Sequence, residues 1–217
     1  MAPLGLSALR SRLSRGSSGK GWQPPEASWS RSFGLGWKNP FTVRYASNLD
    51  DGPWHGMPLG GFGAGCLGRS SRGDFNLWHL DGGEHWYGSI PDCQFALWEK
   101  QGDQVRVHAL ATEPMRDDSR PESGKPLSRW QWYPASTEET STGTYAARYP
   151  LSWNHYDGVF RADVSCEAFS PILPGDYQRS SYPVALFRWT LSNPTNKPLE
   201  LSLLLSWRNT VGWFTNT

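Results

Sequence analysis

The sequence has few cysteines, few methionines and no long hydrophobic run. Its 217 residues include 3 Cys and 3 Met. Cys66, Cys93 and Cys166 lie far apart and lack CxxC spacing, which argues against a disulfide framework or a zinc site and favours a reducing compartment. Apolar segments such as Pro183–Phe187 and Leu203–Leu205 are far shorter than the roughly 20 residues that a membrane-spanning helix needs. We therefore expect a cytoplasmic protein without a transmembrane helix.

Acidic residues are absent from the first 25 positions. Four of the 21 basic residues fall there, so the rest of the chain is slightly acidic. That acidic balance matches the phosphate backbone of a nucleic acid poorly and argues against such a partner. Ser, Gly and Arg dominate residues 1–36 without any hydrophobic period, and this composition predicts a disordered basic tail. The folded domain is then expected over 37–217.

What the sequence does contain is tryptophan, glycine and proline. The 13 Trp argue against intrinsic disorder, since disordered chains are poor in aromatic residues. The 23 Gly and 17 Pro favour short strands and many turns. Residues 163–169 alternate with a period of two, which places Val164, Cys166 and Ala168 on one face of a strand. No segment predicts a helix longer than about two turns. The sequence therefore predicts an all-β fold, an antiparallel β-sandwich.

Two apolar segments near the end of the chain predict paired strands. Pro183–Leu191 and Leu199–Trp207 are separated by a segment rich in turn residues, Ser192–Pro198, so an antiparallel hairpin is expected. Trp189 and Trp207 on these segments are expected in the core, and so is Trp153 on an earlier strand.

The last residues predict a domain that continues beyond the chain. Trp213 and Phe214 follow the apolar strand without a polar tail. We expect the sandwich to be incomplete at this end and the chain to be the front portion of a longer protein.

A glycine-rich segment, Leu59–Gly68, contains a formal GxGxxG match at Gly63, Gly65 and Gly68. A dinucleotide site needs a strand before this motif and a helix after it. Prolines precede the motif here, and a turn followed by a strand-like segment, Phe75–Leu80, comes after it. The pattern instead predicts a turn in which backbone passes close to another surface.

The densest group of potential metal ligands follows that strand. Its members are His79, Asp81, Glu84 and His85. Their spacing matches neither HExxH nor a facial triad, so no metal site is predicted. Trp78 and Trp86 flank the group, and aromatic rings beside hydrogen-bonding groups are the composition that sugar recognition requires.

No catalytic set is evident among the carboxylates. The adjacent pairs are Asp50/Asp51, Asp117/Asp118 and Glu138/Glu139. Glycoside hydrolysis needs two carboxylates facing one another across a sugar, about 5–10 Å apart, whereas strand alternation points adjacent residues to opposite faces. We interpret these pairs as solvated charges and predict no catalytic residue, no metal and no cofactor in this chain.

Several motifs together carry a family resemblance. In chain order they are Met57–Arg69, Arg72–Leu80, Ala147–Trp153, Glu167–Tyr177, Ser181–Phe187 and Leu205–Gly212. With these motifs the sequence resembles the N-terminal domain of glycoside hydrolase family 116, the family of the non-lysosomal glucosylceramidase and its bacterial β-glucosidase relatives.

The resemblance implies a retaining enzyme with an N-terminal β-sandwich and a catalytic (α/α)6 barrel that carries the Glu nucleophile and the Asp acid/base. This chain would end before the barrel, lack both catalytic groups and be inactive alone. Its partner would be that barrel, and a β-glucoside or glucosyl lipid would be met only through it. The residues expected to face the barrel or the sugar are Gly60, Gly61, Gly63, Gly65, Trp78, His79, His85 and Trp86.

Two other functions stay open at this point. A free-standing carbohydrate-binding module also combines a β-sandwich with surface Trp residues, and a truncated fragment would have no activity. For Trp78 and Trp86, a place in the sandwich core is an equal alternative to a surface role.

Overall fold

The fold consists of antiparallel sheets and one short helix. A computed structural model describes residues 9–13, 22–35, 56–80, 86–113 and 130–210. Sheet A has the order β1-β13-β7-β8, sheet B the order β12-β11-β10-β9-β2, and sheet C the order β3-β4-β5-β6. All strand pairs within these sheets are antiparallel, which confirms the predicted fold class.

The strands are short, as the many turn residues predict. Sheet A contains β1 (Leu9–Leu13), β7 (Gln94–Gln101), β8 (Gln104–Ala109) and β13 (Leu199–Ser206). Sheet B contains β2 (Trp29–Ser32), β9 (Gly143–Arg148), β10 (Leu151–Tyr156), β11 (Asp163–Phe169) and β12 (Leu186–Ser192). Sheet C contains β3 (Met57–Leu59), β4 (Cys66–Arg69), β5 (Phe75–His79) and β6 (Trp86–Tyr87). The helix, α1 (Tyr177–Ser180), has a single turn.

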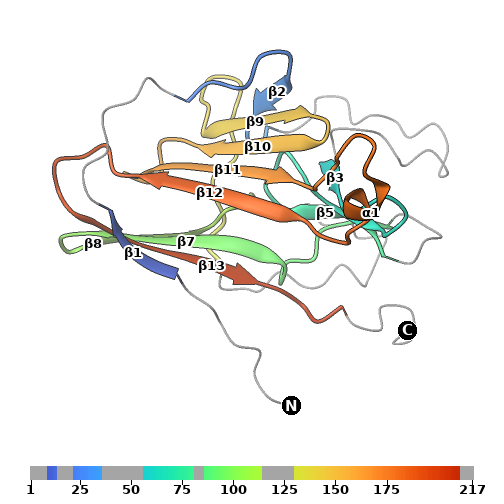
Figure 1. The fold of residues 1–217 in the computed structure, drawn as a ribbon. Coiled ribbons are helices and arrows are strands. Elements are labelled where there is room, and N and C mark those ends of the chain that lie inside the picture. Colours follow the sequence, from blue (N-terminus) through green and yellow to red (C-terminus); the bar gives the residue numbers. More distant parts are fainter. Residues whose placement is uncertain (1–8, 14–21, 36–55, 81–85, 114–129, 211–217) are drawn as a thin grey trace.

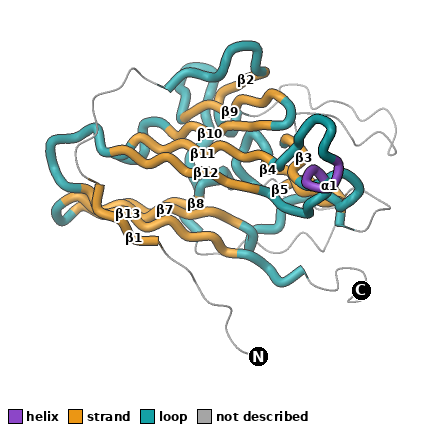
Figure 2. The backbone as a smooth tube through the Cα atoms, in the orientation of Figure 1, coloured by secondary structure: helices purple, strands orange, loops and turns teal. Residues whose placement is uncertain are grey.

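Sheets A and B form two layers, and sheet C lies at one end of them together with α1 (Figure 1). The tube view shows the same arrangement, with strands in the layers and the helix at the sheet C end (Figure 2). One hydrophobic cluster joins the three sheets: it includes Leu97 and Leu201 of sheet A, Tyr156 and Val164 of sheet B, and Trp78 of sheet C. The core therefore extends from between the two layers into sheet C.

Strand β11 follows its predicted alternation. Val164, Cys166 and Ala168 are buried, while the residues between them are more exposed. Strand β8 also alternates, but Val105 and Val107 are 50% and 42% exposed, so their face is the outer face of sheet A. A period of two identifies a strand, but the packing of the layers decides which face is inner.

The predicted hairpin between the last two strands is wrong. β12 pairs with β11 in sheet B, whereas β13 pairs with β7 and β1 in sheet A. The connection therefore passes from one layer to the other. Asn193 stabilises its turn by donating from Nδ2 to the Lys197 carbonyl at 2.8 Å, and Gln101 Nε2 donates to Thr195 Oγ1 at 2.9 Å. A turn of this length can join adjacent strands or span the roughly 10 Å between packed sheets, so its composition does not distinguish the two.

The expected disordered tail over 1–36 is wrong where those residues are described. β2 pairs with β9 at the edge of sheet B, and β1 pairs with β13. Phe33 is fully buried in the core and its amide donates to the Gly143 carbonyl at 2.9 Å. Strand β2 has only four residues, none of them buried, and the core residue Phe33 follows its end. Such a segment is too short to produce a recognisable hydrophobic period, which is why composition alone missed it.

Strand β10 presents its polar residues to the interior. Ser152, Asn154 and Tyr156 are buried, whereas Trp153 lies on the opposite, outer face of sheet B. Its indole Nε1 donates to Glu167 Oε2 at 2.9 Å on that face. The expected core position of Trp153 is therefore wrong. Trp189 and Trp207 do pack against the core cluster, as predicted.

The three thiols are unpaired, and Cys93 and Cys166 are buried. Burial raises the pKa of both of these thiols to about 11 and also raises the pKa of Cys66. Since the thiolate is the reactive form, we expect a thiol reagent at pH 8 to modify at most Cys66 rapidly in the native chain and all three thiols after denaturation. Prompt modification of all three thiols in the native chain, or fewer than three after denaturation, would contradict this arrangement.

Candidate functional site

The glycine-rich loop joins β3 to β4 at the sheet C end of the molecule. No helix follows it: β4 turns into β5, so the nucleotide-binding interpretation fails as the sequence indicated. Gly60, Gly61 and Gly63 lie in the loop, and Gly65 directly precedes β4. The amide of Ala64 donates to the Gly61 carbonyl at 3.1 Å, which closes a turn around Phe62.

Two glycines permit close backbone contacts. A Cβ on Gly61 would lie 2.4 Å from the Ser181 carbonyl carbon and 2.5 Å from the Tyr182 oxygen. Gly65 has a φ of +78° and leaves a Cβ only 2.5 Å from the His79 oxygen. Larger residues would displace backbone at either position. The loop therefore packs directly against the segment that carries α1, as the glycine pattern predicted.

Hydrogen bonds fasten the loop to that segment. Gly60 N donates to Ser170 Oγ at 2.7 Å, and Ser170 Oγ donates to the Val184 carbonyl at 2.9 Å. Phe62 N donates to the Ser180 carbonyl at 2.9 Å. Ser170 and Ser180 are both buried, so these bonds are shielded from water and hold the two segments in one arrangement.

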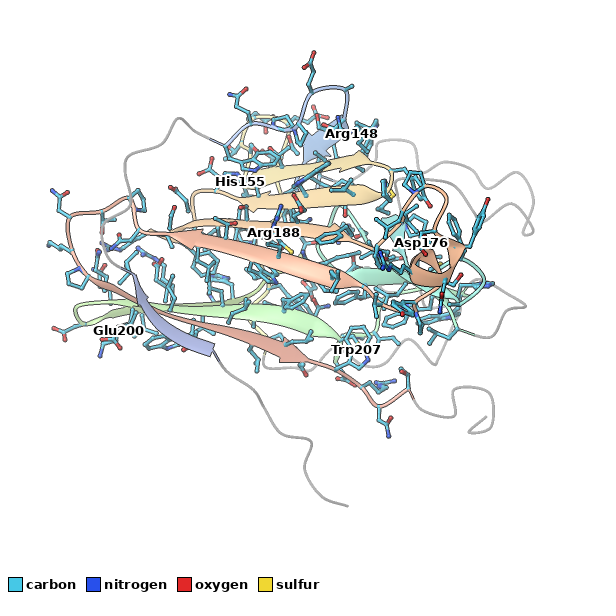
Figure 3. The ribbon with its side chains drawn as sticks, in the orientation of Figure 1. Arg148, His155, Asp176, Arg188, Glu200 and Trp207 are labelled. Atoms are coloured by element: carbon cyan, nitrogen blue, oxygen red, sulfur yellow. The ribbon has the colours of Figure 1, made fainter. Side chains whose placement is uncertain are left out.

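Helix α1 is anchored by its own flanking residues. Arg179 N donates to the cap residue Asp176 through Oδ1 at 3.0 Å, and Leu173 N donates to Ser180 Oγ at 2.8 Å. Asp176 lies at α1 and Trp207 just after β13 in Figure 3. The short helix is thus fixed on the sheet C end of the sandwich.

Large aromatic side chains protrude from this anchored region. Phe62 is 48% exposed, Tyr177 76% and Tyr182 53%. The rings of Phe62 and Tyr177 lie 6.5 Å apart between centroids. We call these three residues, together with the backbone of the glycine-rich loop, the end surface. Rigid exposed aromatics on a fixed scaffold are typical of a surface that contacts a partner.

The sequence-predicted site residues divide between this surface and the core. Gly60, Gly61, Gly63 and Gly65 build the loop, but Trp78 is only 1% exposed and its Nε1 donates to the Gly88 carbonyl at 2.9 Å. For Trp78 the structure thus supports the core alternative.

The other predicted residues lie close to Trp78 or outside the described ranges. Trp86 is half-buried, packs against the core cluster and lies 6.2 Å from Trp78 between ring centroids. His79 is partly buried at the end of β5, and His85 lies outside the described residues.

The remaining candidates show no assembled site. Within the described ranges, no group of three His, Cys, Asp or Glu side chains could hold a metal ion. Glu138 and Glu139 lie on an exposed turn, where Thr137 Oγ1 donates to Glu139 Oε2 at 3.0 Å. The Asp50/Asp51 and Asp117/Asp118 pairs, with Asp81 and Glu84, fall outside the described residues. In the part of the chain that is described, no helix has the length and apolar character needed to cross a membrane.

Arg69 is a central residue that sequence reasoning missed. It is fully buried where the three sheets meet. Its Nε donates to the Gly73 carbonyl at 2.9 Å, Nη1 to Asn154 Oδ1 at 2.9 Å, and Nη2 to the Leu110 carbonyl at 2.9 Å and Tyr156 Oη at 2.5 Å. A single sequence does not show that an Arg is buried. The polar residues at the inner positions of β10 are the feature that could have indicated a buried polar partner.

The aromatic surroundings of Arg69 complete its environment. Its guanidinium carbon lies 5.3 Å from the centroid of the Phe95 ring and 5.4 Å from that of Trp189. Rings at these distances favour a cation. Arg69 therefore bonds β4 to both layers. This fixes the position of β4, the strand that follows the glycine-rich loop.

These features define a class: an all-β sandwich domain that exposes a rigid aromatic surface at one end. The chain belongs to the N-terminal domain family of glycoside hydrolase family 116. The family model described as "beta-glucosidase 2, glycosyl-hydrolase family 116 N-term" matches residues 56–217. The match confirms the resemblance seen in the sequence motifs and covers sheet C, the end surface and most of both layers.

Proposed function

We propose that this chain is the non-catalytic N-terminal domain of a β-glucosidase-type enzyme and that its end surface packs against the family's catalytic domain. The observation that carries the proposal is the exposed aromatic group Phe62, Tyr177 and Tyr182 on a hydrogen-bonded scaffold, in a chain that belongs to an N-terminal domain family. Aromatic residues are enriched at the buried centres of protein interfaces.

The rigidity of the end surface supports this function. Docking is weakened when loops must be ordered on binding, so a surface that is fixed beforehand binds better for the same buried area. The close contacts at Gly61 and the buried hydrogen bonds of Ser170 and Ser180 hold the loop in one conformation before any partner binds. The domain would then shape one side of the active site without contributing a catalytic group.

The proposal takes its substrate class from the family and its location from the cysteines. A β-glucoside, more narrowly a glucosyl lipid, would be hydrolysed by the Glu and Asp of the catalytic domain. A cytoplasmic location agrees with three thiols that are not paired.

The test uses a protein in which a family 116 catalytic domain follows this chain. We expect the backbone amides of the glycine-rich loop and of 176–184 to exchange with deuterium at least about tenfold more slowly than in the chain alone, because a docked interface excludes water. Replacing both Phe62 and Tyr177 by Ser should abolish this protection and lower β-glucosidase activity.

The matched control is Val107→Ser, which removes a similarly exposed apolar side chain from the outer face of sheet A. It should leave both the exchange protection and the activity unchanged. Unprotected end-surface amides in the two-domain protein, or an equal loss of activity from Val107→Ser, would refute the proposed contact.

A further inference from the structure

A second aromatic surface lies on the outer face of sheet B, away from the end surface. The strand register sets Ala146, Trp153, Glu167 and Arg188 side by side across four strands. Figure 3 labels Arg188 on β12 and His155 on β10. Trp153 occupies the middle of this row because the inner face of β10 carries the polar partners of Arg69.

Two charged groups hold the Trp153 ring in position. Its Nε1 donates to Glu167 Oε2 at 2.9 Å, and Arg188 Nη2 donates to Glu167 Oε1 at 2.6 Å. The side chain of Arg188 is 68% exposed and that of Glu167 is 19% exposed. The indole edge is therefore occupied, its orientation is fixed, and solvent reaches the charged pair beside it.

The polar groups of this row suit a pair of neighbouring hydroxyls. A carboxylate can accept about four hydrogen bonds and a guanidinium can donate five, so Glu167 and Arg188 each keep capacity beyond the bonds described. Each hydroxyl of a vicinal diol can both donate and accept a hydrogen bond. The Glu167 carboxylate, an acceptor, beside the Arg188 guanidinium, a donor, therefore complements a diol. Because the Glu167–Arg188 pair is neutral as a unit, it favours an uncharged ligand.

The adjacent row adds an aromatic stack and further hydroxyls. His155 lies in register with Thr144 and Ser165, and Ser165 with Thr190. The Trp22 ring stacks on His155 with centroids 5.0 Å apart and planes 6° from parallel. Burial lowers the pKa of His155, and the nearby Asp157 and Asp163 act in the opposite direction.

We propose that Trp153, Glu167 and Arg188, with Trp22 and His155 beside them, form a binding subsite for a pyranose ring of a neutral glycan. The apolar C–H face of an all-equatorial sugar such as β-glucose lies against the indole, and its hydroxyls bond to Glu167 and Arg188. This surface differs from the end surface, which exposes Phe62, Tyr177 and Tyr182 and fits a protein partner. The subsite does not depend on the proposed domain contact.

The experiment titrates the 217-residue chain with cellotetraose and follows the indole N–H signals by ¹H–¹⁵N NMR. The Trp153 signal is assigned by its loss in Trp153→Phe. We expect it to shift and saturate with a dissociation constant on the order of 1 mM, as for a single open site. Trp153→Ala should weaken binding at least about tenfold, and Arg188→Ala, at an exposed position, about threefold.

Trp29→Ala is the matched control, since it removes another tryptophan of the same sheet, 37% exposed, at a position outside the Trp153 row. Its binding should equal that of the unmodified chain. A cello-oligosaccharide oxidised to carry uronates should bind more weakly. The proposal fails if no indole signal saturates up to about 20 mM cellotetraose, if neither Trp153→Ala nor Arg188→Ala weakens binding, or if the uronate ligand binds more tightly.

Discussion

Replacing Arg69 by leucine is expected to lower the free energy of unfolding by about 4 kcal/mol. The substitution removes the donors that serve Gly73, Asn154 and Tyr156, whereas the Leu110 carbonyl keeps the bond from Tyr156 Oη at 2.8 Å. Each buried acceptor left without a donor costs about 1–3 kcal/mol, and part of this cost is offset because a buried charge is also removed. Urea denaturation followed by tryptophan fluorescence and circular dichroism measures the change.

The Arg69→Lys variant distinguishes the effect of the positive charge from that of the planar donor geometry of the guanidinium. A lysine keeps the positive charge, but one ammonium group cannot reach acceptors that lie around a planar guanidinium. We expect a loss of about 2 kcal/mol, between the leucine variant and the unmodified chain. Arg179→Leu is the control, because its side chain is 70% exposed and surface substitutions usually change stability by less than about 0.5 kcal/mol. A loss below about 1 kcal/mol for Arg69→Leu would show that Arg69 does not hold the sheets together.

Replacing Trp78 by alanine is expected to cost about 3–5 kcal/mol, the range for removing a large aromatic side chain from a core. The ring lies 6.3 Å from Phe75 and 5.6 Å from Trp207 between centroids. Its removal would leave a cavity among these aromatics and end the hydrogen bond to Gly88. Thermal and urea unfolding of the chain by itself measures the effect, without any partner domain.

Trp78→Phe keeps most of the ring volume and removes the N–H, so a smaller loss of about 1–2 kcal/mol is expected. Trp29→Ala, at a position that is 37% exposed, should cost no more than about 1 kcal/mol. The comparison distinguishes a core tryptophan from a surface one. If Trp78→Ala unfolds with the stability of the unmodified chain, its ring contributes little to the core and becomes a candidate for contact with a partner.

The glycine-rich loop illustrates how much of a site the sequence can predict. Its glycines and the prolines before it predicted a close-packed turn, and the contacts of Gly61 and Gly65 confirm one. The aromatic side chains beside it were not predicted, because Phe62 and Tyr177 lie far apart in the sequence. Only the pairing of β4 with β5 and the bonds to Ser170 and Ser180 bring their segments together.

The positions of the tryptophans, in contrast, could not be predicted from the sequence pattern. Trp153 and Trp189 both lie on short strands of alternating residues, yet Trp189 packs on the core and Trp153 faces outward. Hydrophobicity alone assigns both to the interior. The buried guanidinium of Arg69 reverses the usual preference on β10, since the inner positions of that strand must supply Asn154 and Tyr156 as partners.

By itself, the sequence determined the fold class, the family and the local turns, because strand periodicity, glycine placement and ordered motifs are properties of short segments. The tertiary structure decided that β12 and β13 belong to different layers, that residues 22–35 join the fold, and which tryptophans face inward. Those outcomes depend on contacts between distant segments, above all on the buried bonds of Arg69 with Asn154 and Tyr156. A pattern in one segment cannot specify such contacts, because their energy depends on what the rest of the chain places opposite it.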